Sequence, residues 1–427
     1  MSAYPLPPSL WAKTAPAAPA TSPLAGAAET DIAVIGGGYT GLAAALALAE
    51  AGARVTLLEA GPIGWGASGR NNGQVIPSLA RGDPDDLVRR LGEKQGEALA
   101  GLVRDAADGV FQLIAKHRID CEAVQAGWIQ PAHRESRLAQ SRARFEQWRR
   151  RGAPVELLDR TRMARLTGSE AWYGGWLNRT GGHINPLGYA RGLARAALAA
   201  GACIHTDSKV EALTPEHERW RLASPGGTLV AKQVILATNA YTGDLNPAQA
   251  RSAVPVQIYQ VATAPISENV RRTIMPEGHG LSDTRGDLLA FHLDGAGRLV
   301  TGGRMVVAYN HGPRLRRRIT LRLQAAFPQL DRPEFEHVWH GLMGVTPDRL
   351  PHLYALGPGL WGWTGCNGRG VALSTAIGRV LAEAALGRPA DELPLPFTAP
   401  RPIPFHGLVR HLAPSMLLYY RWLDRRD

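Results

Sequence analysis

Three closely spaced glycines and one later glutamate are the residues of this sequence whose spacing most clearly predicts chemistry. Gly36, Gly38 and Gly41 follow the apolar run 31–35, and Glu59 closes the next apolar run. In such a pattern the first glycine permits a tight turn, the second lets the backbone approach a pyrophosphate, and the third lets helix and strand pack closely. The acid can accept the ribose hydroxyls. The pattern therefore predicts a site for an adenine dinucleotide.

The segment that follows Glu59 indicates which dinucleotide to expect. It continues directly from the second predicted strand and is rich in glycine, at Gly61, Gly64, Gly66, Gly69 and Gly73. A nicotinamide-binding domain usually continues into another helix, whereas an extended glycine loop can lie along a longer cofactor toward its ring. FAD is therefore the expected cofactor.

A second glycine-rich turn lies near the C-terminus. The run Gly365-Cys-Asn-Gly-Arg-Gly370 follows the apolar stretch 360–363 and precedes a helical pattern that extends to about residue 383. Backbone N–H groups at the start of such a helix can stabilise the negative charge that a flavin acquires on reduction. We expect this turn to face N1 and the C2 carbonyl of the flavin, with a plain strand-turn-helix connection as the alternative.

Several segments together resemble the D-amino-acid-oxidase-like family of FAD enzymes. The likeness is carried by residues 59–74, 234–244 and 362–371, with further matching stretches at 181–187, 298–303 and 339–344. Within the family the chain most resembles the gamma-glutamylputrescine oxidase branch. The likeness extends from about Asp31 to the C-terminus.

The glycine pattern and the resemblance predict the residues that contact FAD. They come from the first glycine turn, the loop after Glu59, two turns of the same domain and the C-terminal turn. They are Gly36, Gly38, Tyr39, Thr40, Gly41, Glu59, Ala60, Gly66, Ala67, Ser68, Arg70, Asn71, Asn72, Gly73, Gln74, Val210, Ala237, Thr238, Gly365, Asn367, Gly368, Arg369, Gly370 and Val371.

The elements that must position these residues predict an α/β fold. The resemblance implies a Rossmann-like FAD-binding domain with an inserted α+β substrate domain, whose antiparallel sheet roofs the flavin. The expected FAD-binding domain comprises 29–83, 158–253 and 340–390, and the substrate domain comprises 84–157 and 254–339. A flexible arm is expected at 1–28, a C-terminal extension at 391–427, and one long helix from about residue 83 to His117.

The reaction that the resemblance implies is oxidation of a primary or secondary amine similar to gamma-glutamylputrescine. A hydride passes to flavin N5, the imine hydrolyses to an aldehyde or keto product, and O2 is reduced to hydrogen peroxide. An amino-acid dehydrogenase that passes electrons to a quinone or carrier protein is the alternative. A second alternative is a flavin-bearing subunit or binding protein that has no enzymatic activity.

Three residues are candidates for the catalytic site. Tyr259 lies on one predicted roof strand, and His292, the candidate for substrate binding or proton handling, lies on another. Strand alternation means that Phe291 and His292 cannot both face the flavin, and a hydrogen-bonded histidine on the far face is the alternative. Arg369 stands where relatives often have histidine, and it would either tune the flavin potential or brace its loop.

The distribution of lysine affects the choice of electron acceptor. Sarcosine-oxidase relatives keep an oxygen-activating lysine in the roof strands. All lysines of this chain lie elsewhere, at Lys13, Lys94, Lys116, Lys209 and Lys232. If oxygen is the acceptor, another cation, His292 or an arginine, must assist.

Composition limits the remaining classes of function. The net charge of +11 arises from 48 basic and 37 acidic residues. The arginines lie largely on predicted helical faces, and aromatic residues do not alternate with them, so nucleic-acid binding is not expected. Cys121, Cys203 and Cys366 are odd in number and lack metal-type spacing, which predicts neither disulfides nor a metal site. A reducing cytoplasm fits this cysteine usage.

Two features of the sequence bear on membrane association. The sequence shows no secretion signal and no uncharged apolar run of about 18 residues, so no transmembrane segment is expected. The C-terminal stretch 417–423 could contact a membrane surface or, as we expect, pack on the body as a capping helix. The oligomeric state is left open.

Overall fold

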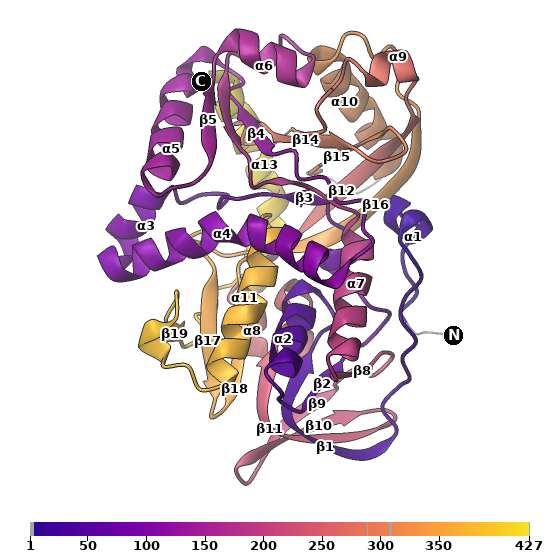
Figure 1. Cartoon of the computed structure of the whole chain (residues 1–427), viewed down its shortest axis with the longest axis vertical. Helices are drawn as coiled ribbons and strands as arrows, with labels where there is room; N and C mark the ends of the chain where they lie inside the picture. Colours follow the sequence, from indigo (N-terminus) through magenta and orange to yellow (C-terminus); the bar gives the residue numbers. More distant parts are fainter. Residues whose placement is uncertain (1–3, 288, 307–309, 427) are drawn as a thin grey trace.

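The computed structural model describes residues 4–287, 289–306 and 310–426, which form two β-sheets with helices packed around them (Figure 1). Within these residues the first sheet has nine strands, seven of them in the order β19-β17-β18-β11-β1-β2-β8, while β10 pairs with β11 and β9 pairs with β10. Its strands are β1 (Gly26–Ile35), β2 (Val55–Leu58), β8 (Cys203–His205), β9 (Ala212–Glu216), β10 (Arg219–Ser224), β11 (Gly227–Leu236), β17 (His352–Gly357), β18 (Leu360–Thr364) and β19 (Phe397–Thr398).

The central strand β1 explains why this sheet is buried on both faces. It pairs in parallel with β2 and β11, as in a Rossmann-like sheet. Ile32 and Val34 join the hydrophobic core under the helices, whereas Ala33 and Ile35 join the core on the opposite face, which also contains Leu222 of β10. A continuous apolar run is therefore what a strand in this position requires.

The second sheet lies above the first in Figure 1 and is largely antiparallel. Among the described residues it has eight strands in the order β16-β12-β15-β14-β13-β4-β6-β5. They are β4 (Trp128–Pro131), β5 (Val155–Leu158), β6 (Gly175–Asn178), β12 (Val254–Pro265), β13 (Gly280–Ser282), β14 (Ala290–Leu293), β15 (Arg298–Gly303) and β16 (Phe335–Val345). The small strands β3 (Gln74–Val75) and β7 (Gly182–His183) pair with each other. The predicted fold class is confirmed.

Helices cover both sheets. They are α1 (Leu10–Thr14), α2 (Tyr39–Glu50), α3 (Pro84–Leu91), α4 (Glu93–His117), α5 (Leu138–Arg150), α6 (Arg160–Thr167), α7 (Pro186–Ala199), α8 (Pro247–Ala250), α9 (Glu268–Arg271), α10 (His311–Ala326), α11 (Gly370–Ala385), α12 (His406–Leu412) and α13 (Met416–Arg426). On the second sheet, α10 buries Leu315, Ile319 and Leu323 at helical spacing. None of the helices in the described part of the chain combines the length and apolar character that a membrane span needs.

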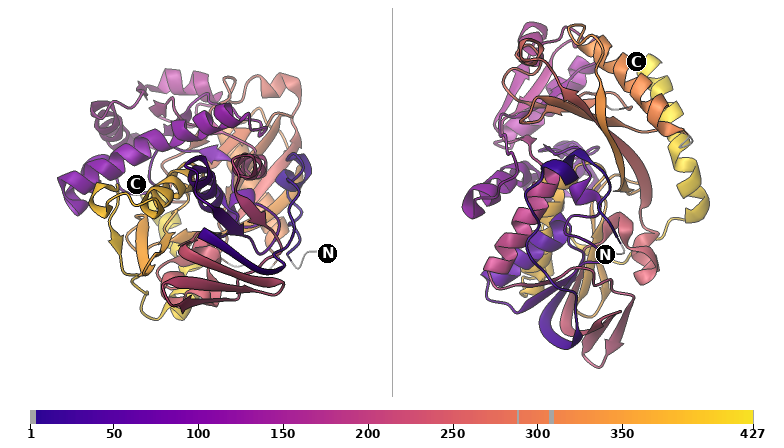
Figure 2. Two further views of the ribbon diagram at one scale, coloured as in Figure 1. Left: turned by 60° about the horizontal axis from the view of Figure 1, so that its bottom comes forward. Right: turned by 90° about the vertical axis from the view of Figure 1, so that its right-hand side faces the viewer.

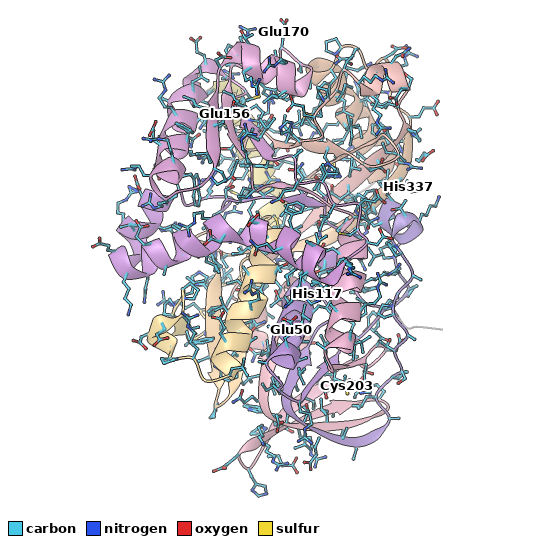
Figure 3. All side chains as sticks on the ribbon, in the orientation of Figure 1. Glu50, His117, Glu156, Glu170, Cys203 and His337 are labelled. Carbon is cyan, nitrogen blue, oxygen red and sulfur yellow. The ribbon has the colours of Figure 1, made fainter. Side chains whose placement is uncertain are left out.

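Two expectations about residues 84–178 need correction. The long helix is divided into α3 and α4, because Gly92 between them has φ of 81°. Leu99 and Val103 of α4 share the core of the first sheet's helices, and its last turn contacts α2 through His117 and Glu50 (Figure 3). Conversely β6 pairs with β4 and β5, so the chain returns to the first sheet only after Asn178, not at residue 158.

The N-terminal segment is not the free arm that its Pro/Ala-rich composition predicts. Leu10 and Trp11 are fully buried in a cluster that includes Leu187 of α7 and Val300 of β15. The Trp11 indole donates a hydrogen bond to the Asn71 carbonyl at 2.9 Å. The expectation of a flexible arm is therefore wrong for α1, which fastens the loop after Glu59 to α7 and the second sheet.

The C-terminal helix α13 is the capping helix that we expected. Leu417 and Tyr420 are buried against the body, while Tyr419 and Trp422 are about half exposed. The right-hand view of Figure 2 shows α13 in yellow beside α10 in orange. Arg421 of α13 and Arg318 of α10 both form ion pairs with Asp287, which fixes this arrangement.

Candidate cofactor and active site

A cavity of about 1400 Å³ is lined by residues of both sheets. Sites for drug-sized ligands occupy about 300–1,000 Å³. This cavity is larger, and it begins at the carboxyl end of β1, where ligands of open parallel sheets bind. It has room for a dinucleotide and a substrate together.

The first wall is the turn between β1 and α2. Gly38 is the N-cap of α2 and makes no side-chain capping bond, so the helix presents backbone N–H groups to the cavity. A Cβ atom on Gly41 would lie 1.9 Å from the Gly36 carbonyl oxygen, which is the close packing that the pattern predicts. This turn can receive a pyrophosphate.

Glu59 lies beside that turn. One carboxylate oxygen accepts a hydrogen bond from Gly37 N at 2.5 Å, and the other accepts one from Gly61 N at 2.9 Å. Burial raises the pKa of Glu59, although these backbone bonds act in the opposite direction. Because a carboxylate has about four acceptor positions, it can still accept the hydroxyls of a ribose.

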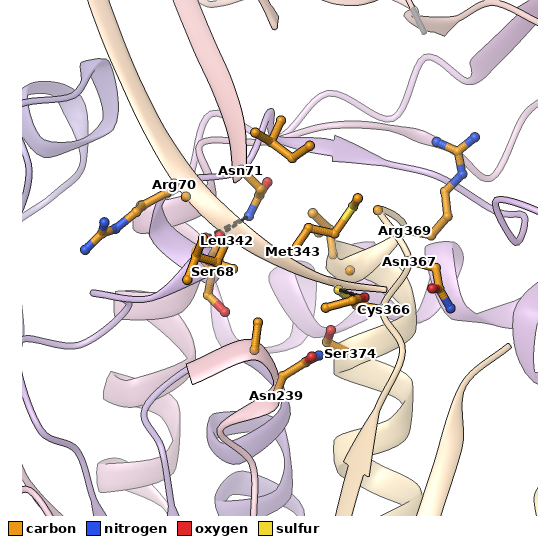
Figure 4. Close-up of a pocket in the computed structure, with 18 of the residues that line it drawn as sticks. Ser68, Arg70, Asn71, Asn239, Leu342, Met343, Cys366, Asn367, Arg369 and Ser374 are labelled. Atoms are coloured by element: carbon orange, nitrogen blue, oxygen red, sulfur yellow. Dashed lines mark hydrogen bonds between the residues drawn. The ribbon is translucent and has the colours of Figure 1, made fainter. Parts of the chain in front are cut away.

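The loop after Glu59 is held from several directions. The Ser68 hydroxyl accepts a bond from Tyr39 N at 3.0 Å, and Asn71 donates to the Tyr39 hydroxyl at 3.1 Å. Arg70 donates to the Trp65 carbonyl at 2.6 Å and stacks over the Trp65 ring at 4.4 Å. The backbones of these residues thus run along one side of the cavity (Figure 4).

The C-terminal turn forms the opposite wall. Asn367 has φ of 47°, and its side-chain oxygen accepts a bond from Thr346 N at 3.0 Å. A Cβ on Gly368 would lie 2.9 Å from the Met343 sulfur, so the turn packs closely on β16 (Figure 4). Helix α11 begins at Gly370 without a side-chain cap. A second helix N-terminus therefore faces the same cavity.

Most of the predicted cofactor contacts line this cavity. They are Gly36, Gly38, Tyr39, Thr40, Glu59, Ala60, Gly66, Ala67, Ser68, Arg70, Asn71, Asn72, Gln74, Val210, Ala237, Thr238, Asn367, Gly368, Arg369, Gly370 and Val371. Gly41, Gly73 and Gly365 are not among the lining residues that the structure describes. They lie behind it, where a Cβ would meet a backbone carbonyl oxygen at 1.9, 2.3 and 2.5 Å respectively.

Sequence reasoning missed other lining residues. They include Trp65, Lys209, Asn239, Tyr241, Thr242, Leu342, Met343 and Ser374. Trp65 and Ser374 lie in segments that the glycine turns already mark, one between two loop glycines and the other in the first turns of α11. Most of the remaining residues lie in segments that carry the resemblance, 234–244 and 339–344, and Lys209 adjoins the predicted contact Val210, so these signals could have been extended to them.

Two of the three catalytic candidates need correction. Tyr259 is 2% exposed and lies in the core of the second sheet, where its ring contacts His340. Its neighbours Ile258 and Gln260 line the cavity instead, because side chains alternate along β12. The lining residues among those described do not include His292 or Phe291 either.

His292 is enclosed by aromatic rings. Its ring lies 4.4 Å from that of His183 and 6.4 Å from that of Trp11, in both cases stacked. Burial, and then the neighbouring His183, lower the pKa of His292 well below its usual value. The imidazole is therefore neutral at physiological pH, and we interpret it as a structural residue.

Arg369 is the catalytic candidate that lines the cavity. It is 8% exposed and lies 5.5 Å from the centre of the Trp128 ring. Burial lowers its pKa to about 10, with a smaller contribution from Arg144, so the guanidinium still carries its charge at neutral pH. None of the described carboxylates forms an ion pair with it, and its Nε has no hydrogen-bond partner. Figure 4 shows Arg369 and Asn367 leaving the same turn in opposite directions.

These residues fit a bound FAD. The helix N-termini of α2 and α11 carry no side-chain cap, so their N–H groups could bind the pyrophosphate and the edge of the flavin that becomes negative on reduction. Glu59 could accept the ribose hydroxyls. Buried polar atoms that line the cavity without a protein partner include Asn72 Oδ1 and Trp363 Nε1. Buried polar groups normally have partners, so a polar ligand is expected there.

Comparisons with known proteins agree with this geometry. A family model described as FAD dependent oxidoreductase (DAO) matches residues 31–384. The chain is 33% identical to gamma-glutamylputrescine oxidoreductase of Escherichia coli (strain K12) over 362 residues, which is 84% of each chain.

Solved structures share the fold at lower identity. Glycine oxidase from Geobacillus kaustophilus superposes with a TM-score of 0.71 at 23% identity, covering 87% of this chain and 99% of that one. L-Amino acid deaminase from Proteus vulgaris, with its specific insertion sequence deleted, gives a TM-score of 0.73 at 20% identity, covering 93% and 98%. The family match extends from β1 to α11 and ends before the C-terminal helices.

Proposed function

The chain belongs to the FAD dependent oxidoreductase family, and from this premise we propose that it oxidises a primary or secondary amine of the gamma-glutamylputrescine type with O2 as electron acceptor. Its cofactor is FAD, and the coarser activity, oxidation of amines or amino acids, follows from the family. The observation that carries the proposal is that the N-termini of α2 and α11 open onto one cavity whose remaining walls come from the second sheet. The name of the Escherichia coli relative supports the substrate class.

When bound, FAD supplies the two-electron acceptor for a hydride from the carbon that bears the amine. The chain's own residues orient the reactants. The backbone of α2 and Glu59 would hold the nucleotide, and the N–H groups of α11 would stabilise negative charge on a bound flavin. Ile258, Gln260 and Leu342 line the second-sheet side of the cavity and exclude water from the substrate.

No dedicated base is required if the amine binds in its neutral form. The imine product can then hydrolyse after it leaves the enclosed site. With His292 and Tyr259 away from the cavity, none of the three catalytic candidates except Arg369 remains in contact with it. This arrangement supports a reaction in which the protein positions the amine and the cofactor accepts the hydride.

Arg369 is our candidate for assisting oxygen. Reduction of O2 passes through an anionic species, and a buried cation lowers the free energy of that charge. Of the lysines, Lys209 lines the cavity, but it adjoins Val210, where the family contacts adenine. Arg369 instead adjoins the turn that we expect to face the flavin ring.

The alternative acceptor is a quinone or carrier protein, which would make the enzyme a dehydrogenase. One experiment tests the substrate and the acceptor together. Purified holoenzyme is mixed anaerobically with gamma-glutamylputrescine, putrescine and a set of amino acids while flavin absorbance is recorded. We expect gamma-glutamylputrescine to bleach the flavin and air to restore the colour with formation of hydrogen peroxide.

Each other outcome has a definite meaning. Failure of every amine and amino acid to bleach the flavin would contradict the proposed function. Bleaching that a quinone reverses, but air does not, would assign the dehydrogenase activity. Bleaching by an amino acid alone would retain the coarser activity and reject the substrate.

A further inference from the structure

The C-terminal helix α13 lies outside the residues that the family model matches, yet it forms part of the cavity wall. The matched residues end at 384, and α13 spans Met416–Arg426. Tyr420, Leu423 and Asp424 of this helix line the same cavity as the predicted FAD contacts. This wall contacts Gly286, Arg304 and Arg349, which are not among the expected FAD contacts.

Tyr420 is the centre of this wall. It is 8% exposed, and the guanidinium groups of Arg304 and Arg81 lie 5.2 and 5.5 Å from its ring centre. Its hydroxyl accepts a hydrogen bond from Arg349 at 3.2 Å. A Cβ on Gly286 would lie 3.0 Å from Tyr420, so the loop that precedes β14 is packed against the ring. Cation–π contacts of this kind orient arginine side chains.

The acidic residues near this wall already have ion-pair or hydrogen-bond partners within the protein. Asp287 pairs with Arg318, Arg322 and Arg421. Asp424 accepts the backbone N–H groups of Gly286 and Asp287 at 2.7 and 3.0 Å, and Asp283 pairs with Arg285. These contacts fix α13 and the 283–287 loop in place.

Among the described residues, three arginines beside Tyr420 lack a carboxylate partner: Arg81, Arg304 and Arg349. Arg304 donates to the Gly286 carbonyl at 2.6 Å and Arg349 donates to Tyr420. Burial lowers the pKa of Arg304, whereas the nearby Asp287 carboxylate and Tyr420 act in the opposite direction and the charge of Arg349 adds to the lowering. Like charges at the edge of a cavity favour a bound anion.

We propose that Arg304 and Arg349, oriented by Tyr420 of α13, bind a carboxylate of the substrate, and that α13 thereby selects amines that carry a carboxylate. This inference rests on the proposed function and names the feature of the substrate that the site recognises. In gamma-glutamylputrescine the glutamyl α-carboxylate lies at the end opposite to the free amine of the putrescine part. Arginine is well suited to it, because its planar fork can bind a carboxylate through two hydrogen bonds.

Putrescine lacks that carboxylate and provides the comparison substrate. For Arg304→Gln and for Arg349→Gln we expect KM for gamma-glutamylputrescine to rise about 10- to 100-fold, the usual effect of losing a hydrogen bond between charged groups. The kinetic constants for putrescine should hardly change. Tyr420→Phe keeps the ring and removes the bond to Arg349, so KM should rise while kcat is retained. Tyr419→Phe, on the exposed side of the same helix, is the matched control.

A second measurement does not depend on turnover. Glutarate, a dicarboxylate without an amine, is titrated into the oxidised holoenzyme and binding is followed by calorimetry. Wild-type protein should bind it, and Arg304→Gln and Arg349→Gln should bind it at least about 10-fold more weakly. Flavin content and unfolding temperature show that each variant is folded.

The outcomes separate the two proposals. Equal effects of the arginine variants on putrescine and gamma-glutamylputrescine, or glutarate binding that the variants do not weaken, would overturn the carboxylate site. Arginine-dependent glutarate binding in an enzyme that oxidises no amine would retain the site and reject the proposed function.

Discussion

Arg369 raises a question at the scale of a single residue, because a buried cation without a carboxylate partner costs stability. Such a group is retained where its charge is useful, here next to the turn expected to face the flavin. We predict that Arg369→Gln leaves the rate of anaerobic flavin reduction nearly unchanged. The rate of reoxidation by O2 should fall at least about 10-fold, which corresponds to a rise of about 1.4 kcal/mol in the activation free energy. Stopped-flow absorbance measures both steps.

Arg369→Lys is the control, because it keeps the charge in a similar place. Its reoxidation rate should lie closer to that of the wild type. The loss of the unpaired charge should also leave the glutamine variant at least as resistant to unfolding. Reoxidation as fast in Arg369→Gln as in the wild type would limit Arg369 to bracing the loop.

The histidine pair predicts a pH dependence of stability. Burial lowers the pKa of His183 to about 4, and His292 is shifted in the same direction. The unfolded chain binds a proton on each histidine below about pH 6.5, whereas the folded protein does not until lower pH. Stability is therefore complete above about pH 6.5 and is lost as the pH falls toward 4, by about 3 kcal/mol for His183.

Unfolding temperatures measured at several pH values test this prediction. His292→Phe removes one of the two groups and should flatten the curve between about pH 6.5 and 4. Because the His292 ring does not line the cavity, kcat of this variant should differ from the wild-type value by less than about threefold. That corresponds to a change of under about 1 kcal/mol in the activation free energy. A large loss of kcat with the pH slope unchanged would restore His292 as a catalytic candidate.

For single residues, the sequence does not show which side chains of strand β12 face the cavity and which face the core. Alternation was evident, but Tyr259 and Gln260 are both buried, at 2% and 7% exposure, so hydrophobicity does not show which of them faces the cavity. Tyr259 fills the core of the second sheet and Gln260 accepts a hydrogen bond from Asn72 at 3.2 Å. Only the tertiary fold distinguishes these two surroundings.

At the scale of elements, the glycine of the first turn of α2 gives a sharp prediction. In Gly41→Ala the new Cβ would lie 1.9 Å from the Gly36 carbonyl, so α2 must move away from β1. We expect a loss of about 1–3 kcal/mol in the free energy of unfolding and markedly weaker FAD binding. Denaturant unfolding and FAD titration of apoprotein measure the two effects.

Gly101→Ala provides a control of the same chemical kind. Gly101 lies within α4 and nothing lies within 4 Å of a Cβ placed there. Alanine should therefore stabilise α4 by about 1 kcal/mol and leave FAD affinity unchanged. If both substitutions had the same effect, the close packing of α2 on β1 would not explain the result at Gly41.

Element type was easier to predict from the sequence than element placement. The glycine turn after β1 and the helix after Gly370 follow from local patterns, and both are present. The four-residue strand β6 could join either sheet, because nothing in Gly175–Asn178 specifies a partner. Trp11, in a segment rich in proline and alanine, is buried because it fits between α7 and the second sheet.

At the scale of the whole molecule, the cavity separates the two sheets along much of their interface. Residues that line it come from widely separated parts of the chain, from Tyr4 near one end to Asp424 near the other. The family match accounts for the cofactor half of this arrangement, and Tyr4 and helix α13, which lie outside the match, complete the lining of the cavity. FAD should therefore act as a structural element that joins the two sheets.

Removal of FAD tests this view. A ligand that binds only the folded state stabilises it by about 2.7 kcal/mol at 100 times its Kd and about 4.1 kcal/mol at 1,000 times. We expect apoprotein to unfold several degrees below holoenzyme, and the unfolding temperature to rise with the logarithm of added FAD. NAD, which shares the adenosine diphosphate part, should raise the unfolding temperature much less, because it lacks the isoalloxazine ring that we expect beside the N-terminus of α11. An unfolding temperature that does not respond to FAD would mean that the sheets are held together by protein contacts alone.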